Sequence, residues 1–90
     1  MPGSSEYYGY FVGDRKNGVG VLKCLNDVYV GCFVNDKKQG HGQFYESDKG
    51  TLYEGNWDDD KKRGEGTLRL EDGRKIKGRW ENNNKYIPIV

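Results

Sequence analysis

The feature that most constrains this 90-residue chain is an internal repeat. An aromatic-x-Gly-x-aromatic motif begins at Tyr7, Tyr29 and Tyr53. A weaker copy begins at Ile76, so that successive copies start 22, 24 and 23 residues apart. A period of this size predicts one supersecondary unit per copy, and neighbouring units have to stack in order to bury a common core.

A second motif, Gly-x-Gly, keeps the same phase. Its three copies lie at 18–20, 40–42 and 64–66, and in each copy the second glycine follows the closing aromatic by nine residues. Two motifs in phase indicate that both belong to one structural unit. The residues assigned to this repeat are Tyr7, Gly9, Phe11, Gly20, Tyr29, Gly31, Phe33, Gly42, Tyr53, Gly55, Trp57, Gly66, Gly78 and Trp80.

This pattern resembles the MORN repeat family, whose unit reads roughly Tyr-x-Gly-x-[Trp or Phe] followed by Gly-x-Gly and a hydrophobic residue. The resemblance covers about residues 7–80 and is closest over 53–70; the first copy has Phe11 in place of Trp, and the fourth lacks both its Tyr and its Gly-x-Gly. It implies a chain of β-hairpins. It also implies two kinds of role, because the family was named for membrane association and includes phospholipid-binding proposals, whereas many members look like protein scaffolds in cilia and the cytoskeleton.

The residues predict the same fold without the resemblance. Segments such as 28–34 are rich in β-branched and aromatic residues, which favour strands. Turn-forming clusters lie within the copies at 13–17, 35–39 and 58–63, and between copies at 26–27, 48–50 and 72–73. We therefore expect an all-β fold, a single-layer antiparallel meander of three to four hairpins with about seven or eight short strands in an elongated, twisted sheet.

The same markers predict the domain organisation. We expect one repeat domain over residues 7–80, with copies near 7–28, 29–52 and 53–75 and a partial copy at 76–85. Residues 1–6 are expected to be a disordered lead-in, and 86–90 a tail or cap.

The spacing also suggests a register within each hairpin. We expect each closing aromatic to cover a glycine across the hairpin, in the pairs Phe11 with Gly20, Phe33 with Gly42 and Trp57 with Gly66. A ring over a residue without a side chain packs tightly and explains why glycine is tolerated inside a strand. We interpret these glycines as packing positions rather than as a phosphate-binding loop.

Alternation of side chains gives the sheet two different faces. One carries the repeat aromatics, and the other is apolar in the first half of the chain and charged in the second. Since a single layer cannot cover both faces, the apolar patch is expected to bind a protein partner, either a helix or an extended segment. The alternative is that residues 81–90 fold back and cap one face. The candidate partner-binding residues are Tyr8, Tyr10, Val12, Val28, Val30 and Val34.

Basic residues in the turns within the repeats form a second candidate site, for anionic lipid or an acidic partner. Aspartates in the same turns offset their charge, and ordinary solvated turns are the simpler interpretation. These candidate lipid- or anion-binding residues are Arg15, Lys16, Lys37, Lys38, Lys61, Lys62 and Arg63. The open edges of the sheet also allow strand pairing with another chain or self-association.

Other classes of function receive little support from the sequence. The net charge of +1 does not favour nucleic acid. Cys24 and Cys32 are expected to point to opposite faces and to form no disulfide, and with His41 they make no zinc site. We expect no cofactor and no catalysis, since the acids lie in turns without a pocket. Without a signal-like N-terminus or an apolar run of roughly 18 residues, the chain is expected to be cytoplasmic, at a cytoskeletal, ciliary or peripheral membrane location.

Overall fold

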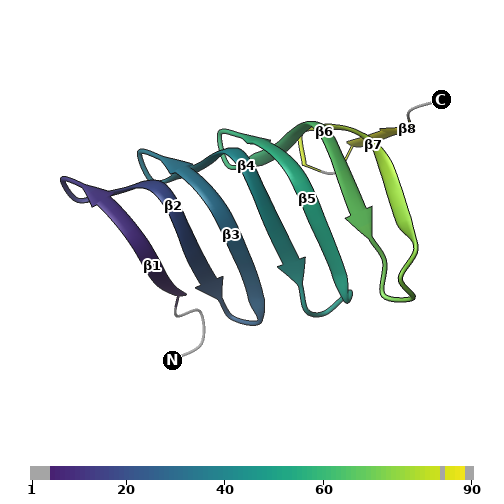
Figure 1. Cartoon of the computed structure of the whole chain (residues 1–90), viewed down its shortest axis with the longest axis horizontal. Helices are drawn as coiled ribbons and strands as arrows, with labels where there is room; N and C mark the ends of the chain where they lie inside the picture. The colour runs from purple at the N-terminus through teal and green to yellow at the C-terminus, as the bar shows by residue number, and fades with distance from the viewer. Residues whose placement is uncertain (1–4, 84, 89–90) are drawn as a thin grey trace.

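The computed structural model describes residues 5–83 and 85–88, which form one antiparallel sheet of eight strands in sequence order (Figure 1). The expected single-layer meander is confirmed. The strands are β1 (Ser5–Val12), β2 (Arg15–Cys24), β3 (Asp27–Val34), β4 (Lys37–Glu46), β5 (Thr51–Asp58), β6 (Lys61–Arg69), β7 (Lys75–Glu81) and β8 (Lys85–Pro88).

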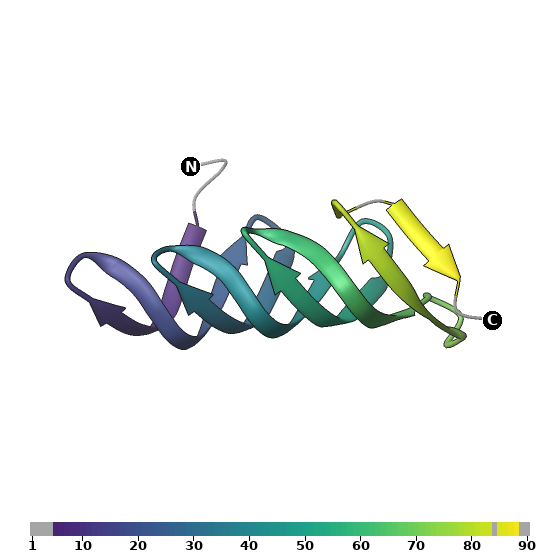
Figure 2. The same cartoon turned by 90° about the horizontal axis from the view of Figure 1, so that it is seen from above.

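The sheet is elongated, with extents of 43 × 26 × 17 Å, and Figure 2 shows its strong twist along the long axis. The first and last strands, β1 and β8, lie at opposite ends of the sheet (Figure 1). Residues 1–4 of the expected lead-in lie outside the described residues, whereas Ser5 and Glu6 already belong to β1. Of the expected tail, residues 86–88 form most of β8, which extends the sheet beside β7 instead of folding back over a face.

The turns within the repeats are shorter than the sequence clusters suggested. Only two residues separate β3 from β4 and β5 from β6, and both residues have positive φ, as at Asn35 (48°) and Asp36 (73°). Two-residue loops of this kind match the right-handed twist of the flanking strands. The basic residues that follow each turn consequently start the next strand rather than extend the loop.

The predicted register within the hairpins is wrong. Glycine lies opposite glycine, in the pairs Gly9–Gly20, Gly31–Gly42 and Gly55–Gly66. The closing aromatics face lysines instead, in the pairs Phe11–Lys16, Phe33–Lys38 and Trp57–Lys62. The cause is a bulge: four residues of the second strand span the same stretch as two residues of the first strand.

The first glycine of each Gly-x-Gly motif makes this bulge. Gly18, Gly40 and Gly64 have φ values of 84°, 93° and 90°. Glycine adopts this left-handed region without steric cost, and β-bulges use it in this way. A side chain on these glycines would have room, since a Cβ on Gly40 would meet Cys32 only at 3.5 Å. Backbone conformation, rather than space, therefore requires glycine at these three positions.

The second glycine of each motif is required by space. The ring that covers it belongs to the opening tyrosine rather than to the closing aromatic, so a Cβ on Gly66 would lie 2.5 Å from Cε1 of Tyr53. The interpretation of these glycines as packing positions thus holds, but with a different ring. The glycines also pair between repeats, as in Gly20–Gly31, Gly42–Gly55 and Gly66–Gly78, so a row of glycines crosses β1 to β7.

The core consists of aromatic rings on one face of the sheet. Its buried members are Tyr29, Phe33, Tyr53, Trp57 and Trp80, with Tyr7, Leu22, Phe44 and Leu68 packed against them. The rings meet mostly edge to face, with centroids 5.0–5.8 Å apart, an arrangement that aromatic quadrupoles favour. We call this surface the aromatic face and the opposite one the second face.

Candidate interaction surfaces

Lysines cover part of the aromatic face. The Nζ of Lys38 lies 5.5–5.7 Å from the centroids of Tyr29, Phe44 and Trp57. Lys62 lies 5.2 Å from the centre of Tyr53 and 5.8 Å from that of Phe44. An ammonium at this distance from a ring is attracted by its quadrupole, by about 0.5–2 kcal/mol per contact.

Lys62 is largely enclosed. Its side chain is 11% exposed, and Nζ lies 4.0 Å from a Glu46 carboxylate oxygen. Burial lowers the pKa of Lys62, and the nearby Glu46 partly offsets this effect. Lys62 therefore belongs to the cover of the core and is poorly placed to meet a membrane surface.

The second residue of the turns after β3, β5 and β7 hydrogen-bonds to the backbone of the preceding repeat. The carboxylate of Asp60 accepts the backbone N–H of Lys38 at 2.8 Å, and the N–H of Asp60 donates to the Lys38 carbonyl at 3.1 Å. Asp36 makes the same two bonds with Lys16, and Asn83 makes them with Lys62. Asp36, Asp60 and Asn83 are therefore structural clamps between repeats, a role that was not predicted from the sequence. The recurrence of Asp or Asn in this phase was the sequence signal for them.

The row of basic residues expected in the loops divides into two sets. Lys16, Lys38 and Lys62 turn onto the aromatic face, each over at least one ring. The other members of the row, Arg15, Lys37, Lys61 and Arg63, are exposed. Two of these exposed cations meet acids: Lys37 pairs with Asp59 at 2.7 Å, and Arg63 with Asp58 at 3.8 Å. A hydrogen bond from Lys37 lowers the pKa of Asp59 and raises that of Lys37 itself.

The N-terminal half of the second face is an open apolar surface. Tyr10 and Val12 are 70% and 68% exposed, and the side chains of Tyr8, Val30 and Val34 are exposed as well. Val28 is half-buried. Val19, which the candidate set did not include, is exposed beside them. Cross-strand pairing connects this surface, since Tyr8 lies opposite Val21 and Val21 opposite Val30.

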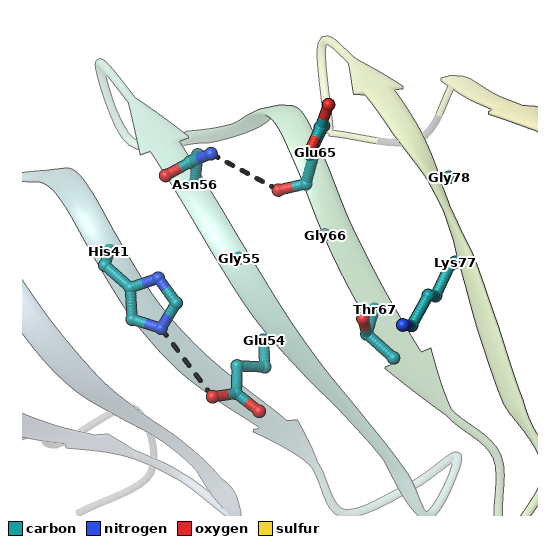
Figure 3. Close-up of a pocket in the computed structure, with 9 residues that line it drawn as sticks. All are labelled: His41, Glu54, Gly55, Asn56, Glu65, Gly66, Thr67, Lys77 and Gly78. Atoms are coloured by element: carbon teal, nitrogen blue, oxygen red, sulfur yellow. Dashed lines mark hydrogen bonds and ion pairs between the residues drawn. The ribbon is translucent and has the colours of Figure 1, made fainter. Parts of the chain in front are cut away.

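The C-terminal half of the second face is polar. A shallow groove of about 490 Å³ has Gly55, Gly66 and Gly78 as its floor. Figure 3 shows the side chains that flank these glycines, with Glu54, Thr67 and Lys77 from β5, β6 and β7 lying across from one another. The Nε2 of His41 lies 3.7 Å from Glu54, and the Asn56 amide donates to the Glu65 carbonyl at 3.4 Å. The groove thus mixes both signs of charge.

Both cysteines are free: Cys24 is exposed and Cys32 is half-buried. Among residues 5–83 and 85–88, no group of three or more His, Cys, Asp or Glu side chains is arranged to hold a metal ion. No helix in the same part of the chain is long and apolar enough to cross a membrane.

An open single-layer sheet of stacked hairpins, with its aromatic core on one face, defines a β-hairpin repeat module. The family model for the MORN repeat matches three consecutive segments, residues 7–26, 29–51 and 53–73, and the chain belongs to the MORN repeat family. The family is generally non-catalytic, and its repeats often serve in protein or membrane interactions. The comparison with curated proteins finds no match.

Proposed function

We propose that this chain is a non-catalytic scaffold or adaptor that binds a protein partner through the N-terminal half of its second face. The observation that carries the proposal is the exposure of Tyr10 and Val12, at 70% and 68%, within a continuous apolar surface. Contiguous exposed apolar surface is characteristic of interaction sites. The aromatic face offers less apolar surface for this role, because its core rings are buried against one another and lysines lie over part of it.

Two rows of side chains, one on each side of the glycine positions, give this surface its shape. Between these rows a track runs across the strands on the second face. A helix or an extended segment laid along it would contact Tyr and Val side chains at one end and charged ones at the other. A chain that binds a partner in this way would suit the role of a structural subunit in a cytoskeletal or ciliary assembly.

A charge placed in the apolar patch tests the proposal. Val30 lies on the second face of β3 and is exposed, so Val30→Asp should leave the fold intact and abolish partner recovery in a pulldown. Thr67→Asp is the matched control, because Thr67 occupies the same cross-strand row between Glu54 and Lys77. Undiminished recovery with Val30→Asp would contradict the proposal.

A second candidate function is attachment to anionic phospholipids. The observation that favours it is that Arg15, Lys37, Lys61 and Arg63 are exposed along one edge of the sheet. Their ion pairs with Asp58 and Asp59 weaken the field that this edge presents. Co-sedimentation with liposomes at low salt, with and without phosphoinositides, tests this function; absence of lipid-dependent pelleting would exclude it.

A further inference from the structure

The first strand of the sheet exposes an aromatic ring that every later repeat buries. Phe11 is 57% exposed, whereas the equivalent Phe33, Trp57 and Trp80 are 2%, 4% and 5% exposed. The difference comes from the repeat that precedes each ring. Tyr7 packs on Phe33, Tyr29 on Trp57 and Tyr53 on Trp80, each edge to face. Among the described residues, Phe11 has only Tyr7 of its own strand as an aromatic neighbour.

The outer edge of β1 is also open among residues 5–83 and 85–88, where the strand pairs only with β2. It is eight residues long, with Glu6 as its one charged residue. A long, apolar edge strand presents a row of free N–H and C=O groups and readily pairs with another strand. The opposite end of the sheet differs, because β8 has four residues and ends at Pro88, which has no backbone N–H to donate.

The sequence of β1 is symmetric about Gly9. Aromatic residues occupy both positions before this glycine, Tyr7 and Tyr8, and both positions after it, Tyr10 and Phe11. The later repeats lack this symmetry: the residues next to the glycine are Val30 and Cys32 in β3, and Glu54 and Asn56 in β5. An antiparallel strand that is symmetric about its centre can pair with its own copy and place like residues together.

We propose that β1 is a self-association site, at which it pairs antiparallel with β1 of a second copy about Gly9. In this register Tyr8 lies opposite Tyr10 of the partner subunit, on the second face. Tyr7 lies opposite Phe11 of the partner subunit, on the aromatic face. Cross-strand aromatic pairs stabilise a sheet, and the two-fold axis makes each of these two aromatic pairs occur twice.

The backbone of β1 fits this pairing. The N–H and C=O of Lys16 bond to Asp36 and so point away from β1. Phe11, opposite Lys16, therefore also points its own N–H and C=O away from β2, and so does Gly9, two residues before it. The pairing would place Gly9 opposite Gly9 of the partner subunit, in the way that Gly20 lies opposite Gly31 between β2 and β3. The charged Glu6 would face Val12 of the partner subunit, so no like charges meet directly.

The dimer would also join the two apolar patches. Tyr8, Tyr10 and Val12 lie at the edge of the second face, so two copies would form one ribbon with a single apolar surface at its centre. This inference does not rest on the proposed function, since an edge can pair whether or not the face binds another protein.

A charge-swap experiment with the full chain tests the proposal. Sedimentation or light scattering of the unmodified chain should show a concentration-dependent rise from the chain mass of 10.3 kDa toward twice that value. The double variant Tyr8→Lys/Tyr10→Lys should remain monomeric, because like charges would lie directly opposite each other. Tyr8→Glu/Tyr10→Glu should be monomeric for the same reason, and a mixture of the two variants should form a heterodimer.

The control is Val30→Asp, which changes the second face away from the edge and should leave the dimer intact. Far-ultraviolet circular dichroism of each variant verifies that the sheet is retained. A chain that stays monomeric at all concentrations would overturn the proposal. So would a dimer that both double variants preserve, or double variants that fail to associate when mixed.

Discussion

At the residue scale, the opening tyrosine of each of the first three repeats has two roles. Its ring lies over the glycine opposite, and its hydroxyl donates to the carbonyl three residues further on, at 2.8 Å from Tyr29 to Cys32 and 2.9 Å from Tyr53 to Asn56. That carbonyl belongs to the residue opposite the bulge, where the sheet ladder is interrupted. The tyrosine thus satisfies the polar group that the bulge leaves unpaired.

Adding one methyl group at the covered glycine should be severe. In Gly66→Ala the new Cβ would lie within 3 Å of Tyr53, which is buried and has no free space to move into. We expect the free energy of unfolding to fall by about 3 kcal/mol or more, at the upper end of overpacking costs. Urea unfolding measures this loss. The adjacent, exposed Glu65→Ala is the control and should change stability by no more than about 0.5 kcal/mol; equal effects would contradict the packing role.

Stability should fall in alkali because of the buried phenols. Burial raises the pKa of Tyr53 to about 12 and also raises that of Tyr29, whereas a tyrosine in the unfolded chain titrates near 10. The phenols lose their protons at lower pH in the unfolded state than in the folded state. The stabilisation that the buried protonated phenols contribute is therefore complete below about pH 10 and is lost as pH rises toward 12. Unfolding monitored against pH should show this decline, and Tyr53→Phe should reduce it. Tyr10→Phe, at an exposed position, should leave the decline unchanged.

At the element scale, the turn clamps tie one hairpin to the next. Asp60→Gly keeps the positive φ but removes the carboxylate that accepts the Lys38 N–H, so it should destabilise the sheet by about 1–2 kcal/mol. Asp60→Asn is the control, because the amide oxygen of Asn83 accepts the Lys62 N–H in the equivalent turn, and it should have little effect. Thermal unfolding of the two variants checks this difference, and similar losses would argue against the clamp.

Strand positions and faces could be predicted from the sequence because both follow from period and alternation. The register could not be predicted, because it depends on a bulge formed by Gly18 and its equivalents in the later repeats. These glycines have positive φ in the structure, but from the sequence alone a glycine in a strand is compatible with several conformations. The candidate interaction residues were likewise predicted only in part. Alternation correctly placed Tyr10 and Val30 on an exposed second face. Lys38 and Lys62 were misplaced, because without the register a basic residue after a turn looks like a loop residue.

At the scale of the whole molecule, the two faces of the sheet serve different purposes. The aromatic face forms the core of a single layer, because rings from successive repeats pack on one another and lysines cover them. The second face is left open, and its composition changes from tyrosine and valine over β1 to β3 to charged residues over β5 to β7. The repeat positions therefore account for the fold, and the positions that vary between repeats set the composition of the second face.

The most direct test of this account is site-specific photo-crosslinking in the cells that express the protein. A photoreactive residue is placed in turn at Val30 on the apolar half of the second face, at Thr67 on its polar half, and at Lys61 on the turn edge, all on the surface of the sheet. The account predicts that the position at Val30 gives the strongest crosslinks to protein. Crosslinking of equal strength from all three positions, or crosslinks to lipid from Lys61 alone, would contradict it.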